Sequence, residues 1–459
     1  MAGLFASGVD SNCVLLDAGA GKGTLTQAFL DQCVSGDLEF TSVHLDAFEF
    51  DEALCVSLGQ TLTKYASLPG FTACIHNVDF VNAAADKLSG PILSRDTIRY
   101  THAILNPPYR KIDRSSHYRA TLRRVGIETV NLYTAFVALS LALLAEHGQL
   151  VAIIPRSFCN GPYYRSFREF ILNHAALRHL HLFKSRTTVF KNDDVLQENV
   201  IILLERGSSQ GDVAVSSSTD HSFSDLITHQ FAFDQIVMPG DPEQFIHIPV
   251  SAGQNALELS QRTPYLLEQL GIEVSTGPVV DFRVREHLRD MPEPHSVPLL
   301  YPSHFSHSAT VWPRPGSKKP NAILYNAETR KWLYPNGYYC VVRRLSSKEE
   351  KRRIVASVVE PSAFPNASMI GFENHLNVLH EHRHGLPEAL ARGLAVYLNT
   401  TAVDEFFRRF NGHTQVNATD LRRIKYPSRD VLVQLGEWAK QQPELTQTMI
   451  DGAYGAMIA

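Results

Sequence analysis

The sequence predicts an α/β protein: a mainly parallel sheet covered by helices on both faces, followed by a second domain of α+β type. Two observations predict this class. Between residues 13 and 205, short apolar runs alternate with helical patterns, as in proteins built from strand–helix–strand units. After Pro239-Gly240-Asp241-Pro242 the chain changes to short strand-like runs rich in proline, aromatic residues and histidine. We therefore expect a domain boundary near residue 240, with domains 1–240 and 241–459.

Each element of the first domain is expected where an apolar run or an amphipathic stretch is bounded by turn residues. The expected strands are 14–17, 42–46, 72–77, 103–105, 149–154, 179–183 and 200–204. The expected helices are 24–33, 51–65, 131–146 and 163–174. We expect the strand at 198–205 to close the sheet as an antiparallel edge strand. In the second domain, helices are expected at 386–398 and 401–410.

The composition excludes several classes of protein. The six cysteines lie far apart without a Cys-x-x-Cys pair, which indicates reduced thiols in a cytoplasmic protein and argues against a zinc site. The twenty histidines show no metal-ligand spacing, so no metal is expected. The longest apolar run, 136–145, is too short to span a bilayer, so no membrane partner is expected. A net charge of −4 means that any nucleic-acid surface must be local.

The tetrapeptide Asn106-Pro107-Pro108-Tyr109 is the most informative motif of the chain. It follows the apolar run 103–105, which reads as a buried parallel strand that ends at a ligand-binding edge. Two prolines make a stiff turn without backbone donors, so the Asn106 amide and the adjacent carbonyls can accept hydrogen bonds from a planar nitrogen donor. Tyr109 then offers a flat face on which a planar group can stack.

A glycine-rich turn follows the first strand. In Asp17-Ala18-Gly19-Ala20-Gly21 the small residues let a ligand approach the backbone closely. The Gly-x-Gly-x-x-Gly spacing of a dinucleotide site is absent. A phosphate is a poor ligand beside the Asp17 carboxylate, whereas the ammonium group of an amino acid is a good one.

Acidic residues also end the next two strands. Glu49 follows the second strand, where a carboxylate commonly binds ribose hydroxyls, and we favour it over Asp46. Asp79 ends the third strand and can accept a hydrogen bond from an adenine amino group. Taken singly, each acid is equally well explained as a solvated loop residue or a helix cap. Three acids at successive strand ends, followed by Asn-Pro-Pro-Tyr, favour a binding site.

On these motifs the sequence resembles the gamma class of S-adenosylmethionine-dependent DNA adenine N6-methyltransferases, the TaqI-like enzymes of bacterial restriction-modification systems. The resemblance covers essentially the whole chain, and the segments 128–133 and 412–421 resemble one subgroup of these enzymes. It implies a Rossmann-like methyltransferase sheet and a C-terminal target recognition domain. The family carries a longer segment before the first strand than the dozen or so residues found here. We therefore expect a shortened form, or a pocket that is completed differently.

The resemblance also implies a role for each site residue. Asp17, Gly19 and Gly21 line the cofactor pocket, Glu49 binds the ribose, and Asp79 binds the cofactor adenine. Asn106 and the Pro107 carbonyl accept from the target amine, Tyr109 stacks on the flipped base, and Phe190 lies where the family places a second aromatic residue. The implied partners are double-stranded DNA and a cognate restriction endonuclease, and we expect a monomer.

Two basic stretches are candidates for DNA contacts. The stretch 110–124, directly after Asn-Pro-Pro-Tyr, carries six cations against one acid and suits phosphate contacts. The stretch 412–423 combines polar groups with two arginines, although Thr419-Asp420 also reads as a helix cap. The DNA-binding candidates are Arg110, Lys111, Arg123, Arg124, Arg422 and Arg423.

Two alternatives remain open at this point. Methyltransferases that act on another planar nitrogen, in a protein glutamine or in ribosomal RNA, also carry Asn-Pro-Pro-Tyr, but the large second domain favours DNA. The other alternative is a catalytically impaired DNA-binding subunit. Four intact residues argue against it: Asp17, Asp79, Asn106 and Tyr109. A cofactor-binding measurement separates this last alternative from an active enzyme.

Overall fold

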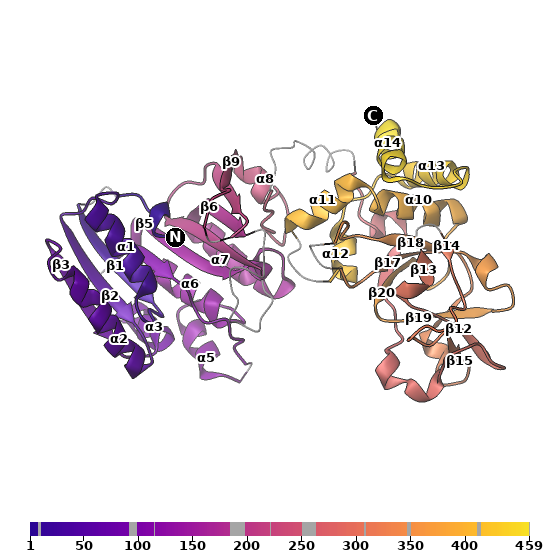
Figure 1. Cartoon of the computed structure of the whole chain (residues 1–459), viewed down its shortest axis with the longest axis horizontal. Helices are drawn as coiled ribbons and strands as arrows, with labels where there is room; N and C mark the ends of the chain where they lie inside the picture. The colour runs from indigo at the N-terminus through magenta and orange to yellow at the C-terminus, as the bar shows by residue number, and fades with distance from the viewer. Residues whose placement is uncertain are drawn as a thin grey trace. The chain divides into compact units, whose positions relative to one another are not determined.

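The structure is a computed structural model that describes residues 1–7, 11–90, 99–113, 115–183, 198–220, 222–249, 263–306, 309–346, 350–410 and 415–458. The chain divides into two compact units, Met1–Ala252 and Gly253–Ala459 (Figure 1). The expected boundary near residue 240 therefore falls within the first unit, and the role expected of each unit remains a prediction.

Unit 1 is built on one mixed sheet. Among the described residues its strand order is β3-β2-β1-β4-β5-β7-β6-β8-β9. The strands β3, β2, β1, β4 and β5 run parallel to one another, so the predicted α/β sheet is confirmed. The bounds are β1 Asn12–Ala18, β2 Ser42–Phe48, β3 Phe71–His76, β4 Tyr100–Leu105, β5 Leu144–Pro155, β6 Ala175–Phe183, β7 Asn199–Arg206, β8 Val213–Ser218 and β9 Ile227–Phe231.

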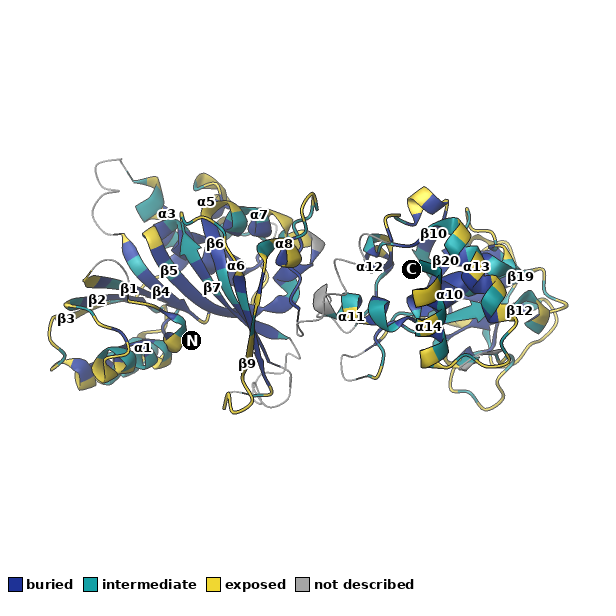
Figure 2. Cartoon of the chain, turned by 90° about the horizontal axis from the view of Figure 1, so that it is seen from above, coloured by how far each residue is buried: buried dark blue, intermediate teal, exposed yellow. Residues whose placement is uncertain are grey.

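One prediction about this sheet is wrong. Strand β7 is antiparallel, as expected, but it is not an edge strand, because it pairs with β5 on one side and with β6 on the other. The sheet then continues through β8 and β9, neither of which is among the expected strands. Figure 2 shows the result: β5 and β7 are buried, whereas β3 and β9 at the two ends carry exposed residues.

Helices cover both faces of the sheet, and each face has its own apolar core. One core packs α1 (Thr24–Ser35) and α2 (Glu52–Leu62) against the sheet. The other core packs four helices against the opposite face. These are α3 (Phe80–Ser89), α5 (His117–Arg124), α6 (Leu132–Leu143) and α7 (Arg165–His174), and the short α8 (Phe233–Ile236) contributes Ile236 to the same core.

Unit 2 combines small sheets with helices near its end. Its sheets, among the described residues, have the orders β10-β20-β17-β18, β11-β15-β12-β19-β16 and β13-β14. The strands are β10 Glu273–Thr276, β11 Leu288–Arg289, β12 Ser296–Leu300, β13 Phe305–Ser306, β14 Ala309–Thr310, β15 Ala322–Leu324, β16 Leu333–Pro335, β17 Tyr339–Arg343, β18 Ala356–Val359, β19 Met369–Phe372 and β20 Leu376–His380. The helices are α10 Glu388–Leu398, α11 Thr401–Phe410, α12 Ala418–Arg423, α13 Arg429–Lys440 and α14 Gln447–Ile458, and the first two confirm the predicted helices.

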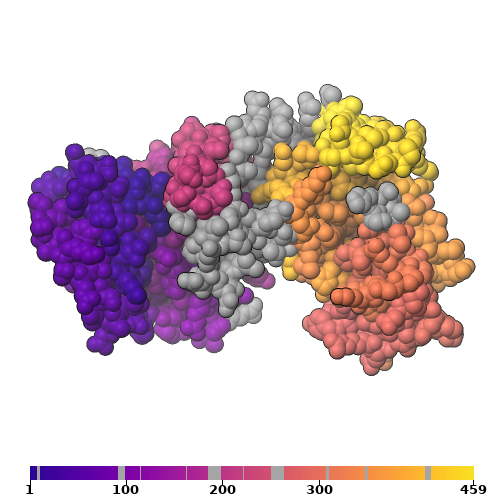
Figure 3. Space-filling view, in the orientation of Figure 1, coloured from indigo at the N-terminus to yellow at the C-terminus, as the bar shows by residue number. Residues whose placement is uncertain are grey.

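Helices α10 and α13 cross at two glycines. A Cβ atom at Gly393 would lie 1.7 Å from the Leu432 carbonyl oxygen, and one at Gly436 would lie 1.7 Å from the Ala389 oxygen. Only glycine fits at this crossing, so the two glycines allow α13 to pack closely on α10. Helices α13 and α14 form the yellow surface in Figure 3. Within the part of the chain that the structure describes, no helix has the length and apolar character needed to cross a bilayer.

Candidate active site at the carboxyl edge of the sheet

The predicted site residues of unit 1 follow four neighbouring strands. Because β1 is parallel to β2 and β4, and β2 is parallel to β3, these strands end at the same edge of the sheet. The glycine-rich turn follows β1, Glu49 follows β2, Asp79 lies shortly after β3, and Asn106 follows β4. Ligands of open α/β sheets bind at this edge, in the crevice outside the carboxyl ends of the strands.

The turn after β1 depends on glycine. Gly19 and Gly21 have φ angles of +79° and +56°, a region that other residues rarely adopt. The turn is fixed to β2, because the Gly19 and Ala20 N–H groups both donate to the Phe48 carbonyl at 2.9 and 3.0 Å. Among the residues that the structure describes, none would lie within 4 Å of a Cβ atom at Gly21. The space above Gly21 is therefore open to a ligand.

Asp17 lies beneath this turn and is 1% exposed. Its Oδ2 accepts a hydrogen bond of 2.5 Å from the Thr26 hydroxyl of α1, whereas its buried Oδ1 has no partner among the described residues. Burial raises the pKa of the Asp17 carboxyl to about 7, although the bonds from Thr26 act in the opposite direction. A buried carboxylate oxygen without a donor is suited to a cationic group of a ligand.

Glu49 joins the turn to the start of α2. Its Oε2 accepts from the Gly21 N–H at 2.8 Å and its Oε1 accepts from the Asp51 N–H at 2.9 Å. Asp46, by contrast, is buried within β2, where it accepts hydrogen bonds from the Tyr100 hydroxyl and from His76. Since only Glu49 lies at the edge of the sheet beside the turn, the geometry favours Glu49 over Asp46 as a ligand contact.

Asp79 begins α3 beside a group of aromatic rings. Its Oδ1 accepts from the Asn82 N–H at 2.9 Å, as in a helix cap, and its Oδ2 accepts from the Tyr118 hydroxyl at 2.6 Å. The Phe80 ring lies 5.3 Å from that of Phe48 and 5.0 Å from that of Phe136. Sequence reasoning missed these rings, although Phe48 and Phe80 stand directly next to the two acids in the sequence.

The Asn-Pro-Pro-Tyr segment directly follows the end of β4. Asn106 and Tyr109 are exposed and Pro107 is buried. The Tyr109 hydroxyl donates to the Ile153 carbonyl of β5 at 3.2 Å and lies 3.5 Å from Asn106 Oδ1. The edge-to-face contact of the Tyr109 ring with buried Tyr133, at 6.1 Å and 80°, further fixes its orientation. Sequence reasoning also missed this role of Tyr133.

The basic stretch that follows is attached to the start of α6. The Ile112 N–H donates to the Val130 carbonyl and the Leu132 N–H donates to the Arg110 carbonyl, both at 2.8 Å, and Lys111 forms a bridge with Asn131. On α5, Arg123 pairs with Glu128, and Arg124 pairs with Asp86. Since all four of these side chains are at least half exposed, the pairs are weak, and a phosphate can compete for both arginines.

The candidates from the second basic stretch lie on α12. The Arg422 guanidinium donates to the Val274 carbonyl of β10 at 2.7 Å. The helix begins after Asn417, which forms a capping box with Asp420. A helix start therefore lies in this stretch as expected, but the cap residue is Asn417, and Thr419 lies within the helix. Phe190 and residues 412–414 lie outside the described residues.

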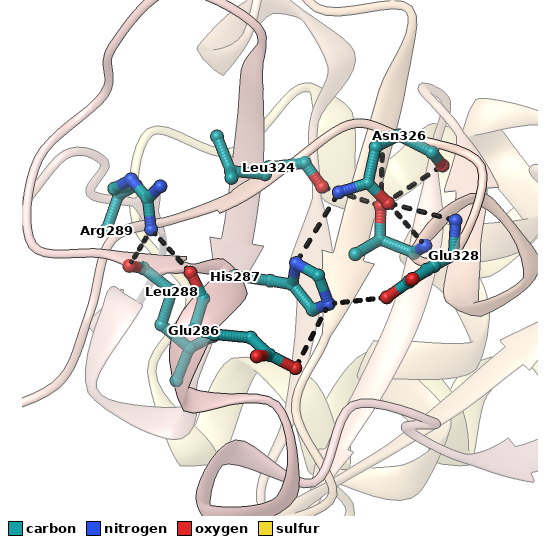
Figure 4. Close-up of polar contacts among 8 residues, drawn as sticks. Glu286, His287, Leu288, Arg289, Leu324, Asn326 and Glu328 are labelled. Carbon is teal, nitrogen blue, oxygen red and sulfur yellow. Dashed lines mark hydrogen bonds and ion pairs between the residues drawn. The ribbon is translucent and has the colours of Figure 1, made fainter.

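Two groups of side chains in the described part of the chain have the spacing of metal ligands: Asp46, Cys74 and His76, and Glu286, His287 and Glu328. Figure 4 shows His287 between the two glutamates, with Nε2 3.1 Å from Glu328 Oε2. Asn326 Oδ1 accepts the Glu328 and Thr329 N–H groups, so its amide nitrogen faces His287 Nδ1. His287 Nδ1 therefore faces an amide donor and Nε2 faces Glu328, so hydrogen bonds alone account for the orientation of this ring.

Comparison with known proteins identifies the family. The chain is 51% identical over 446 residues to the type II methyltransferase M.BsuBI of Bacillus subtilis, an alignment that covers 97% of the chain and 88% of that protein. It is 43% identical over 462 residues to the type II methyltransferase M.PstI of Providencia stuartii, covering 98% of the chain and 89% of that protein. The chain belongs to the type II DNA methyltransferases.

Two further comparisons agree with this family. The family described as Eco57I restriction-modification methylase matches residues 74–190, which include the Asn-Pro-Pro-Tyr motif. The solved structure of the type IIL restriction-modification enzyme MmeI in complex with DNA shares the fold of the type II methyltransferase, with a TM-score of 0.56, 11% identity, and coverage of 97% of this chain and 70% of that chain. The likeness to MmeI supports the predicted methyltransferase fold. The relatives and the family match confirm the prediction of a restriction-modification methyltransferase.

The type II methyltransferase uses S-adenosylmethionine, as predicted. The residues present fit this cofactor on two observations. The unpaired Oδ1 of Asp17 suits the ammonium group of the methionine part, and the open space above Gly21 lets a ligand approach the backbone.

Proposed function

We propose that this type II methyltransferase methylates N6 of an adenine that is flipped out of duplex DNA. The observation that carries the proposal is the exposed Asn106 amide beside the oriented ring of Tyr109, at the end of β4. Two hydrogen-bond acceptors can bind the two hydrogens of an exocyclic amine, and the Tyr109 ring can stack on a planar base. A base within a duplex cannot reach such an edge, so the enzyme must flip it out, at a cost of a few kcal/mol.

Each cofactor-pocket residue has a proposed task. Asp17 binds the ammonium group beside the turn of Gly19 and Gly21, Glu49 accepts hydrogen bonds from the ribose, and Asp79 accepts one from the adenine amine. When bound, S-adenosylmethionine supplies the methyl group. The turn is well prepared for this task, because its backbone is already bonded to Phe48 and Glu49.

The catalytic residues act on the target amine. Its lone pair is delocalised into the adenine ring, which makes it a poor nucleophile. The Asn106 side chain and the Pro107 carbonyl accept its two hydrogens, which favours a pyramidal and more nucleophilic nitrogen. Tyr109 holds the flipped base by stacking, and we assign Phe190 to its other face. The transfer then depends on proximity and on correctly placed acceptors.

The two units have different roles in DNA recognition. Unit 1 binds the cofactor and attracts DNA without sequence preference, through Arg110, Lys111, Arg123 and Arg124. Unit 2 selects the sequence, and Arg422 and Arg423 are its proposed contacts. We further propose that the enzyme acts as a monomer in the cytoplasm, beside a cognate restriction endonuclease.

The identity of the methylated base tests the proposed function directly. DNA from cells that express the chain is digested to nucleosides and separated by mass spectrometry. We expect N6-methyladenine in the digest from a host that makes none of its own, and far less of it with the Asn106→Ala variant. Methylated cytosine in place of methylated adenine would contradict the proposal, as would methylation of protein or RNA alone.

Neutralising two arginines of α5 is expected to weaken DNA binding to every sequence. In Arg123→Gln/Arg124→Gln two cations are lost, so the slope of log K against log salt should fall by up to about 1.8 in magnitude if both contact phosphates. Binding titrations at several salt concentrations measure this slope. Arg178→Gln is the matched control, because Arg178 also pairs with an acid, Glu205, but lies near the start of β6, away from the carboxyl edge. A change of site preference in the α5 variant would reverse the roles assigned to the two units.

A further inference from the structure

Tyr118 joins α5 to the carboxylate that we assign to the cofactor adenine. Its hydroxyl donates to Asp79 Oδ2 at 2.6 Å, while Asp79 Oδ1 is occupied by the Asn82 N–H. This hydrogen bond, together with burial, raises the pKa of Tyr118 to about 12. The hydroxyl therefore remains a donor at neutral pH. Both oxygens of Asp79 are thus held by the protein, so the plane of the carboxylate is fixed before any ligand arrives.

The Tyr118–Asp79 hydrogen bond is less exposed than the Arg124–Asp86 ion pair, which also joins α5 to α3. The Arg124–Asp86 ion pair has side chains that are 50% and 70% exposed, and pairs of this kind contribute little to stability. The Tyr118 hydroxyl donates to a half-buried carboxylate, and hydrogen bonds to ionised groups are the stronger class. Leu122, on the same helix, is buried in the core that includes Phe80. Tyr118 itself packs against this core, so its side chain is held by apolar contacts along the ring and by the hydrogen bond at its hydroxyl.

We infer that Tyr118 is a positioning residue for cofactor recognition: it holds the Asp79 carboxylate in the orientation that accepts the exocyclic amine of the cofactor adenine. The inference rests on the proposed role of Asp79. A carboxylate oxygen has two lone pairs, so Oδ2 can accept from Tyr118 and from the amine together. The hydroxyl also replaces a water molecule that would otherwise compete for this oxygen.

The consequence is selectivity for the 6-amino group. Without the hydroxyl, only the Asn82 N–H restrains the carboxylate, and binding of the amine then costs the additional entropy of fixing Oδ2. A cofactor analogue whose 6-amino group is replaced by oxygen offers no such donor and gains nothing from the fixed carboxylate. Tyr118 therefore affects the ratio of the two affinities, whereas a merely structural residue would affect both equally.

The test compares the wild-type protein with Tyr118→Phe, using S-adenosylmethionine and S-inosylmethionine, its 6-oxo analogue, in binding titrations. We expect Tyr118→Phe to lower the preference for the amine about fivefold, as for one net hydrogen bond. In steady-state kinetics the KM for cofactor should rise while kcat stays unchanged. Tyr65→Phe is the matched control, because it also removes a hydrogen bond from tyrosine to an aspartate of unit 1, Asp31, and it should leave the preference unchanged.

A double variant keeps the inference falsifiable. In the Asp79→Asn background, Tyr118→Phe should have no further effect on the affinity ratio, because coupled residues are not additive. Equal weakening of both cofactors in Tyr118→Phe would overturn the inference, and so would a gain in affinity for the amine. Failure of the wild-type protein to distinguish the two cofactors would instead overturn the proposed role of Asp79 itself.

Discussion

Replacing Asn106 with alanine is expected to lower the rate of methyl transfer on the order of a hundredfold or more, while cofactor affinity stays nearly unchanged. Asn106 is exposed at the end of β4, and the cofactor contacts are assigned to β1, β2 and α3. The lost acceptor therefore acts on the target amine alone. Single-turnover kinetics with duplex DNA measure the rate, and a binding titration with S-adenosylmethionine measures the affinity.

The matched control for this variant is Asn12→Ala. Asn12 is an asparagine of unit 1 at the start of β1, where its Oδ1 accepts from the Ser42 hydroxyl, and it therefore lies at the opposite edge of the sheet. Its replacement should leave the rate within a factor of about two, the usual range for surface substitutions. An equal loss of cofactor affinity and rate in Asn106→Ala would mean that Asn106 binds cofactor, which contradicts its assigned role.

Cofactor binding is expected to weaken as the pH falls below about 7, because Asp17 must lose a proton to bind an ammonium group. Burial raises the pKa of this carboxyl to about 7 in the free protein. Below that value the affinity should fall by up to about tenfold per pH unit, since one proton is released on binding. Calorimetry between pH 5.5 and 7, in buffers with different ionisation enthalpies, measures both the affinity and the released proton.

Asp17→Asn is the variant that isolates this carboxyl. It should bind cofactor more weakly at pH 7 and should lose the pH dependence. Although this substitution weakens cofactor binding, it should raise the free energy of unfolding of the cofactor-free protein at high pH. A raised pKa in the folded state means that the native protein holds the proton more tightly than the unfolded chain does, so the stability contributed by this group falls as the pH rises from about 4 to 7. Asp17→Asn should therefore be more stable than the wild type at pH 8 without cofactor. Cofactor affinity that is independent of pH in the wild type would contradict the proposed role of Asp17.

The strands from β1 to β7 could be predicted from sequence because each coincides with a short run of apolar or alternating residues bounded by turn residues. Strand β8 could not, because its segment Ser216-Ser217-Ser218 looks like a linker. In the structure these serines are buried, and His181 of β6 forms hydrogen bonds with the hydroxyls of Ser216 and Ser218. The polar strand is thus satisfied by a partner 35 residues away along the chain. The place of β7 between β5 and β6 was equally hidden, since no local pattern specifies which strands pair.

In the candidate site, too, some residues could be located from the sequence and others could not. The acids and Asn106 could be located because each follows an apolar run, and strand ends are where α/β proteins bind ligands. Tyr118 and Tyr133 could not, because their roles depend on contacts with Asp79 and Tyr109 across 39 and 24 residues of sequence. A tyrosine in a helix carries no sequence signal for the group that its ring or hydroxyl will contact.

The backbone pairing between residues 110–112 and 130–132 affects how far the segment between them, residues 113–129, can differ among relatives. The two N–H···O bonds at 2.8 Å and the bridge from Lys111 to Asn131 hold both ends of the intervening excursion together. They involve only main-chain atoms, so they place few demands on the side chains there. The exposed charges of this segment can therefore differ between relatives while the geometry of Asn106 and Tyr109 is preserved, provided that Tyr118 keeps its hydrogen bond to Asp79. Evolution can thus retune attraction to DNA at this enzyme without touching its chemistry.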